Sequence, residues 1–125
     1  MERWFERAIE VAESATGRAK VGCVALSGND IVAAVTNLQK THTKQYEYAK
    51  RAGFPKKASL HAELRALISS QRPVDTLIVA RVDKKGNLKN SRPCPVCTLA
   101  IQDYPESVEV WYTTEDGFFQ DERFE

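Results

Sequence analysis

The chain has 125 residues, 42% of them hydrophobic and 28% charged. These proportions are typical of a soluble globular protein, and the length suits one core, so we expect a single domain over residues 1–125. No apolar run is long enough to span a membrane, and the first residues lack the apolar segment of a signal peptide, so we expect no membrane partner. Three cysteines do not make a disulfide framework, which favours a cytoplasmic location.

The net charge of +1 conceals a segregation of charge along the chain. Residues 40–92 carry thirteen basic and four acidic side chains, whereas residues 93–125 carry one basic and eight acidic side chains. A central third this basic can present a positive surface to a phosphate-bearing substrate. The alternative is a solvated face whose charges pair with those of the acidic tail.

The first part of the chain predicts a helix followed by a hairpin. Apolar residues recur at three- and four-residue spacing over residues 2–15, which predicts an amphipathic helix whose Trp4 and Phe5 dock on a sheet. Residues 20–26 and 31–36 are short, apolar and separated by turn-forming residues, which predicts an antiparallel hairpin. Because both segments are apolar nearly throughout, we expect both faces of the sheet to be covered.

A long connection, residues 38–58, follows the hairpin and includes a segment, residues 45–52, that is compatible with a short helix. Loops of this length within a compact domain tend to be functional. The connection combines basic and aromatic side chains, namely Lys40, Lys44, Lys50, Arg51, Lys56, Lys57, Tyr46, Tyr48 and Phe54. Such side chains can hold phosphates and stack on bases; the alternative is a lid whose aromatic residues pack on the core. We expect His42 to be a polar lining residue and not a metal ligand.

The second half of the chain alternates helices with strands. The pattern predicts helices over residues 59–70 and 95–103 and strands over residues 76–82, 107–113 and 118–124. Ser59 suits the N-cap of the first of these helices, and Pro95 suits the first position of the second. The complete order implies an α/β fold in which helices cover both faces of a mixed sheet of four to five strands.

Two short motifs supply the donor set of a catalytic zinc site. They are His61-Ala62-Glu63 and Pro93-Cys94-Pro95-Val96-Cys97, and each opens a predicted helix. Zinc prefers nitrogen and sulfur ligands in a tetrahedron, and a catalytic site leaves the fourth position to water. His61, Cys94 and Cys97 would fill three positions and leave Glu63 as a proton carrier. We expect Cys23, which falls within a predicted strand, to be a buried thiol.

The spacing of the first motif restricts where it can act. His61 and Glu63 are two residues apart, so inside a helix they would not face the same way. They can both approach one metal only from the first turn, and an N-cap at Ser59 places them there. A purely structural zinc site is the alternative, but structural sites almost always close with a fourth protein ligand.

These two motifs resemble the H-x-E…P-C-x-x-C signature of the zinc-dependent cytidine/deoxycytidylate deaminase superfamily. The resemblance covers about residues 20–114 and implies a three-layer α-β-α cytidine deaminase-like fold with one Zn²⁺ per chain. It implies the following roles: zinc ligands His61, Cys94 and Cys97, acid–base Glu63, and substrate contacts at Asn37, at the Ala62 N–H and at a backbone carbonyl between Ser91 and Pro93. For Asn37, the alternative is a turn residue at the end of a strand.

The resemblance implies hydrolytic deamination of a cytosine-type base in a pyrimidine nucleoside or nucleotide to the uracil product. An antiparallel last strand would be similar to the free-nucleoside branch, although many small tetrameric members of that branch have Cys where this chain has His61. One alternative is deamination of cytosine within single-stranded DNA or RNA, and another is a non-catalytic zinc-containing binding module. Relatives are often oligomers, so a homo-oligomer is a family-level expectation.

Overall fold

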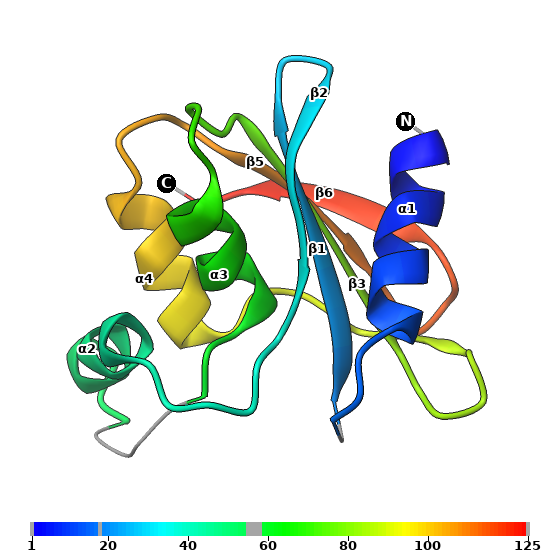
Figure 1. The fold of residues 1–125 in the computed structure, drawn as a ribbon, viewed down its shortest axis with the longest axis horizontal. Helices are drawn as coiled ribbons and strands as arrows, with labels where there is room; N and C mark the ends of the chain where they lie inside the picture. Colours follow the sequence, from blue (N-terminus) through cyan, green and yellow to red (C-terminus); the bar gives the residue numbers. More distant parts are fainter. Residues whose placement is uncertain (1, 18, 55–58, 125) are drawn as a thin grey trace.

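The computed structural model describes residues 2–17, 19–54 and 59–124 (Figure 1). The helices are α1 (Glu2–Glu13), α2 (Thr43–Arg51), α3 (Ala62–Ser69) and α4 (Pro95–Asp103). The strands are β1 (Lys20–Ser27), β2 (Asp30–Thr36), β3 (Thr76–Val82), β4 (Leu88–Lys89), β5 (Glu109–Thr113) and β6 (Phe119–Arg123). Within these ranges no helix is long and apolar enough to cross a membrane.

All six strands belong to one mixed sheet. Its order is β2-β1-β3-β5-β6, and β4 pairs with the end of β3. β3 and β5 run parallel, and every other pair is antiparallel, including β5 with β6. The predicted α/β fold with a mixed sheet is therefore confirmed. The sheet has one strand more than the predicted four to five because β4, with two residues, is too short to leave a pattern in the sequence.

Helices cover both faces of this sheet, as Figure 1 shows. Successive side chains of a strand point to opposite faces, so β3 turns Ile78 toward α1 and its neighbours Leu77 and Val79 toward α3 and α4. α2 packs on α4, away from the sheet. The near-continuous apolarity of the central strands follows from this double burial.

The contact between α1 and the sheet depends on a glycine. A Cβ at Gly22 of β1 would lie 2.4 Å from the backbone N of Ala12 and 2.7 Å from the backbone O of Ala8. The absence of a side chain therefore lets the α1 backbone lie directly on β1. The predicted docking of the aromatic end of α1 is confirmed, because the Phe5 ring stacks on that of Phe119 in β6 at 4.1 Å between centroids.

The predicted start of α3 was wrong. Ser59 is not the N-cap: the helix begins at Ala62, and His61 is its N-cap. Leu60 stays outside the helix because its N–H donates to the carbonyl of Lys40 (3.1 Å) and its carbonyl accepts from the Leu38 N–H (2.9 Å). These cross-chain hydrogen bonds satisfy backbone groups that a helix would otherwise use. The later start keeps His61 and Glu63 at the helix entrance.

We predict that Gly22→Ala destabilises the protein, because the new methyl group clashes with the α1 backbone. Overpacking of this kind typically lowers the free energy of unfolding by about 1–3 kcal/mol, which urea unfolding measures. Ser27→Ala, at the partly exposed end of the same strand, is the matched control and should leave the midpoint unchanged. An unaltered midpoint for Gly22→Ala would show that α1 does not rest on β1 as described.

Candidate active site

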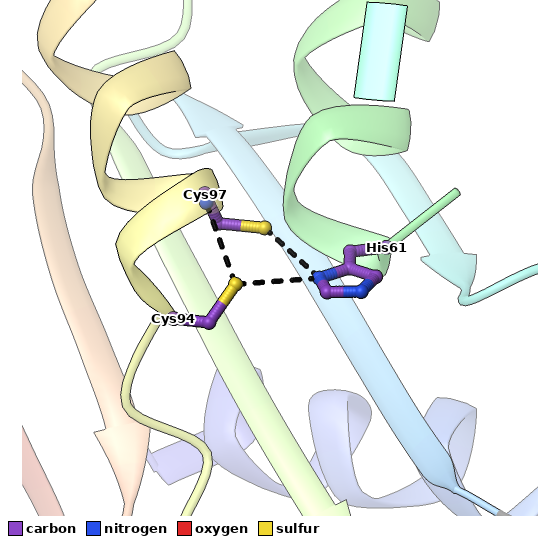
Figure 2. A group of neighbouring side chains, drawn as sticks. All are labelled: His61, Cys94 and Cys97. Carbon is purple, nitrogen blue, oxygen red and sulfur yellow. Dashed lines mark hydrogen bonds between the residues drawn. The ribbon is translucent and has the colours of Figure 1, made fainter. Parts of the chain in front are cut away.

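Three ligand-type side chains converge where α3 and α4 begin. Figure 2 shows the His61 ring at the start of α3 facing Cys94 and Cys97 at the start of α4. The Nδ1 atom of His61 lies 3.2 Å from Sγ of Cys97 and 3.6 Å from Sγ of Cys94. All three ligand atoms lie within 4.8 Å of one another. The three residues that the sequence singled out as zinc ligands are thus brought together.

Local sequence explains why each side chain is available. Cys94 is the N-cap of α4, with Pro95 at the first helical position, and its sulfur accepts a hydrogen bond from the Cys97 N–H (3.5 Å). His61 is the N-cap of α3 but makes no side-chain capping bond, which leaves its ring to face the sulfurs. Both sulfurs lie at a helix N-terminus, where the helix dipole stabilises negative charge.

The donor set fits a zinc ion. Tetrahedral zinc, with Zn–N of about 2.1 Å and Zn–S of about 2.3 Å, separates a nitrogen from a sulfur ligand by about 3.6 Å. The observed separations of 3.2 and 3.6 Å are close to this edge length. Among the described residues, no fourth histidine, cysteine or acidic side chain joins the group. Three protein ligands leave the fourth position of a tetrahedron open, as in catalytic sites.

The electrostatics of the two thiols also favour a cation. A hydrogen bond from the Cys97 thiol, with a further one from His61, lowers the pKa of Cys94 to about 4. The bond to Cys94, together with burial, raises the pKa of Cys97. The thiolate is the form that binds zinc, and a divalent cation would stabilise it on both cysteines.

Glu63 lies in the first turn of α3 and is 5% exposed. Burial raises the pKa of this carboxyl group, and the nearby His61 ring partly offsets that effect. A raised pKa brings a carboxyl group closer to the range in which it can both accept and release a proton, as general acid–base catalysis requires.

A pocket of about 340 Å³ opens beside the three candidate zinc ligands. Its lining residues are Ala19, Val21, Asn37, Gln39, Ser59, His61, Ala62, Glu63, Arg81, Asn90, Ser91, Arg92 and Cys94. The lining thus includes three of the four predicted substrate contacts, Asn37, Ala62 and Ser91. Pro93 does not line it: this residue is buried, and its carbonyl accepts a hydrogen bond from the Thr98 hydroxyl (3.5 Å).

Hydrogen bonds fix two of these lining residues. The side-chain oxygen of Asn37 accepts from the Val21 N–H (3.3 Å), which leaves its NH₂ group without a partner among the described residues. The Ser91 hydroxyl donates to the carbonyl of Val79 (2.8 Å) and accepts from the Thr113 N–H (2.8 Å). Ser91 can therefore offer a substrate its backbone but not its hydroxyl.

The comparison with protein families bears on this geometry. Residues 1–113 match the family described as "Cytidine and deoxycytidylate deaminase zinc-binding region". The chain belongs to this family. The family is one of zinc-dependent deaminases, in agreement with the donor set and the open fourth position found here. No curated protein and no solved structure shows a significant match.

Sequence reasoning missed one residue at this deaminase-type site. Gln45 of α2 is 1% exposed, and its side-chain oxygen accepts a hydrogen bond from the His61 N–H (3.1 Å). Its amide also hydrogen-bonds the Cys97 thiol, which offsets a small part of the rise in the pKa of that thiol. The sequence does offer one signal for the burial of Gln45. It lies four residues before the buried Ala49, so the two residues share one face of the short helix. Gln45 thus links two of the candidate zinc ligands.

The connection before α3 contributes less to the pocket than the sequence suggested. Lys40 and Lys44 are exposed and do not line it. The Tyr46 and Tyr48 rings lie beneath Lys50 and Arg51 of their own helix, with 5.7 and 5.2 Å between the cation and the ring centroid. His42 caps α2 by accepting from the Lys44 N–H (3.1 Å) and does not line the pocket either. Lys56 and Lys57, which belong to the same prediction, lie outside the described residues.

We predict that Cys94→Ala and Cys97→Ala abolish stoichiometric zinc binding, because each removes one of only three protein ligands. Elemental analysis of purified protein measures the bound metal. Titration with cadmium, monitored by the thiolate-to-metal absorbance, gives the number of cysteine sulfurs that bind the ion. The third cysteine supplies the control, since Cys23 is fully buried in β1 and outside the ligand group. Cys23→Ala should keep one zinc per chain. Full zinc occupancy in both ligand variants would disprove this site.

We also predict that Gln45→Ala weakens zinc binding, because loss of a hydrogen bond that orients metal ligands typically lowers metal affinity 10–100-fold. Competition with a chromophoric chelator measures the affinity directly. Gln71→Ala removes the same side chain from an exposed position and should have no effect. Equal affinities for the two variants would show that Gln45 only fills space.

Proposed function

We propose that the protein is a zinc-dependent hydrolase that deaminates a cytosine-type base in a pyrimidine nucleoside or nucleotide, with the uracil product and ammonia released. The observation that carries this proposal is the juxtaposition of an incomplete nitrogen–sulfur ligand group with the buried carboxyl group of Glu63 on the wall of one pocket. A structural zinc site would need neither the open position nor the carboxyl group.

In this proposal, zinc held by His61, Cys94 and Cys97 supplies a Lewis acid that lowers the pKa of water. Glu63 takes a proton from water while the water oxygen adds to the ring carbon that bears the amine. Glu63 then delivers this proton to the adjacent ring nitrogen. Glu63 then carries the remaining hydroxyl proton to the amine, and the C–N bond breaks as the carbonyl of the uracil product forms. Each such proton transfer typically contributes 10²–10⁴-fold to the rate.

Three further residues orient the substrate in this proposal. The free NH₂ group of Asn37 donates to a sugar hydroxyl. The Ala62 N–H donates to the base carbonyl, since the first N–H groups of a helix have no partner within it. The amine of the substrate base donates to the backbone carbonyl of Ser91. The hydrogen bonds of the Ser91 hydroxyl group fix the position of this residue. Pro93 is assigned no contact in this proposal, because it does not line the pocket.

Deamination within single-stranded DNA or RNA is the second candidate. Proteins that hold single strands stack successive bases on aromatic side chains. None of the described residues that line the pocket is aromatic, and Tyr46 and Tyr48 pack against cations of α2. This arrangement supports a monomeric substrate. A homo-oligomer, a cytoplasmic location and a role in pyrimidine metabolism remain predictions from the sequence.

We predict that Glu63→Gln lowers kcat at least 100-fold and leaves zinc content unchanged, because the amide cannot carry protons but keeps the size of the carboxyl group. Loss of the cytosine absorption band measures turnover, and elemental analysis measures the metal. Glu47→Gln, on the exposed side of α2, is the matched control. If wild-type protein holds zinc yet deaminates no cytosine-type substrate, the alternative of a binding module replaces the enzyme.

A further inference from the structure

One cation on the pocket wall is given no task by the proposed reaction and has no partner among the described residues. Arg81 of β3 lines the pocket, and no described residue bonds its guanidinium group. Every other described arginine has a side-chain partner: Arg3, Arg7, Arg51, Arg65, Arg72, Arg92 and Arg123 contact a ring, a carboxylate, a carbonyl or a hydroxyl group. Arg81 is thus the one described arginine free to bind a ligand.

The sheet register places Arg81 next to the proposed sugar site. Arg81 follows Leu77 and Val79 by two-residue steps, so it lies on the face of β3 that α3 and α4 cover. It is aligned with Val21 of β1, the residue that bonds Asn37. Two strand spacings, roughly 10 Å, therefore separate the backbones of Asn37 and Arg81. A substituent on the sugar that Asn37 holds would lie close to the guanidinium group.

The surrounding charge at this end of the pocket is positive. Lys89 of β4 is aligned with Arg81 and shares its face of the sheet. Arg92 also lines the pocket, but two hydrogen bonds (3.0 and 2.8 Å) engage its guanidinium with Glu122. The only acidic side chain among the described lining residues is the buried Glu63. An anionic group at Arg81 would therefore meet attraction without competition from a neighbouring carboxylate.

We propose that Arg81 binds the 5′-phosphate of the substrate, so that the protein acts on a cytosine-type nucleoside monophosphate in preference to the free nucleoside. The guanidinium fork matches a phosphate in a bidentate hydrogen-bonded pair. This inference rests on the proposed function for the identity of the base. The sequence suggested that lysines of residues 38–58 contact the phosphate, but Lys40 and Lys44 do not line the pocket. The proposed phosphate contact therefore lies at the end of β3 instead.

The test compares kcat/KM for deoxycytidine, deoxycytidylate, cytidine, cytidylate and a single-stranded oligonucleotide in wild-type protein and in Arg81→Gln. Hydrogen bonds to charged groups are worth about 1.5–3 kcal/mol, which corresponds to about 10–100-fold. We expect wild-type protein to prefer monophosphates by about that factor and Arg81→Gln to lose the preference through KM. Nucleoside turnover should change less than about 2-fold. Arg81→Lys should recover part of the loss.

Lys84→Gln is the matched control, since this exposed residue follows β3 but does not line the pocket. The proposal is supported if kcat/KM for monophosphates falls selectively in Arg81→Gln and does not fall in Lys84→Gln. Equal turnover of nucleoside and monophosphate by wild-type protein overturns it, as does equal loss on both in Arg81→Gln. Activity confined to the oligonucleotide overturns it as well, while deamination itself stands.

A binding measurement separates this inference from the proposed function. Calorimetry with deoxyuridylate, deoxyuridine and inorganic phosphate needs no turnover. If no substrate is deaminated but deoxyuridylate binds wild-type protein about 10–100-fold more tightly than it binds Arg81→Gln, the phosphate site stands and the enzymatic proposal fails. If deoxyuridylate binds both proteins equally, or binds neither, the phosphate site is disproved whatever the activity.

Discussion

The meeting of two helix N-termini at one end of the sheet is the constraint on which the candidate site depends. His61 and Cys94 are the N-caps of α3 and α4, and Cys97 lies within the first turn of α4. Three side chains from two short segments therefore suffice to present one nitrogen and two sulfurs to a single point. The same geometry puts the positive ends of two helix dipoles beside the two sulfurs and the pocket.

The sheet topology explains why the helices meet there. α3 leads into β3 and α4 leads into β5, and these two strands are parallel neighbours. Both helices consequently begin at the end of the sheet where β3 and β5 finish. Pockets of α/β proteins form at the carboxyl ends of strands for this reason. β1, antiparallel to β3, adds Val21 to the same end, and Asn37 after β2 completes the row.

Local patterns allowed much of this arrangement to be predicted. Pro95 marked the start of α4, and ligand spacing identified the three residues that converge. Tertiary contacts decided the rest. Backbone bonds to a distant segment moved the start of α3 past Ser59. The partnership of Gln45 with His61 depends on how α2 packs, which the helical pattern of residues 45–52 does not reveal. That the guanidinium group of Arg81 has no partner among the described residues can be recognised only in the folded chain.

The edge strand β6 contributes to the pocket from a distance. Glu122 receives hydrogen bonds from Arg92 on the pocket wall and from the Tyr112 hydroxyl (2.9 Å), and the Arg92 guanidinium also lies over the Phe124 ring at 5.2 Å. The outermost strand thereby supports Arg92 at one side of the pocket opening. Substitutions of Glu122 or Phe124 would therefore change the position of Arg92 at the pocket wall, although neither residue belongs to the ligand group of His61, Cys94 and Cys97.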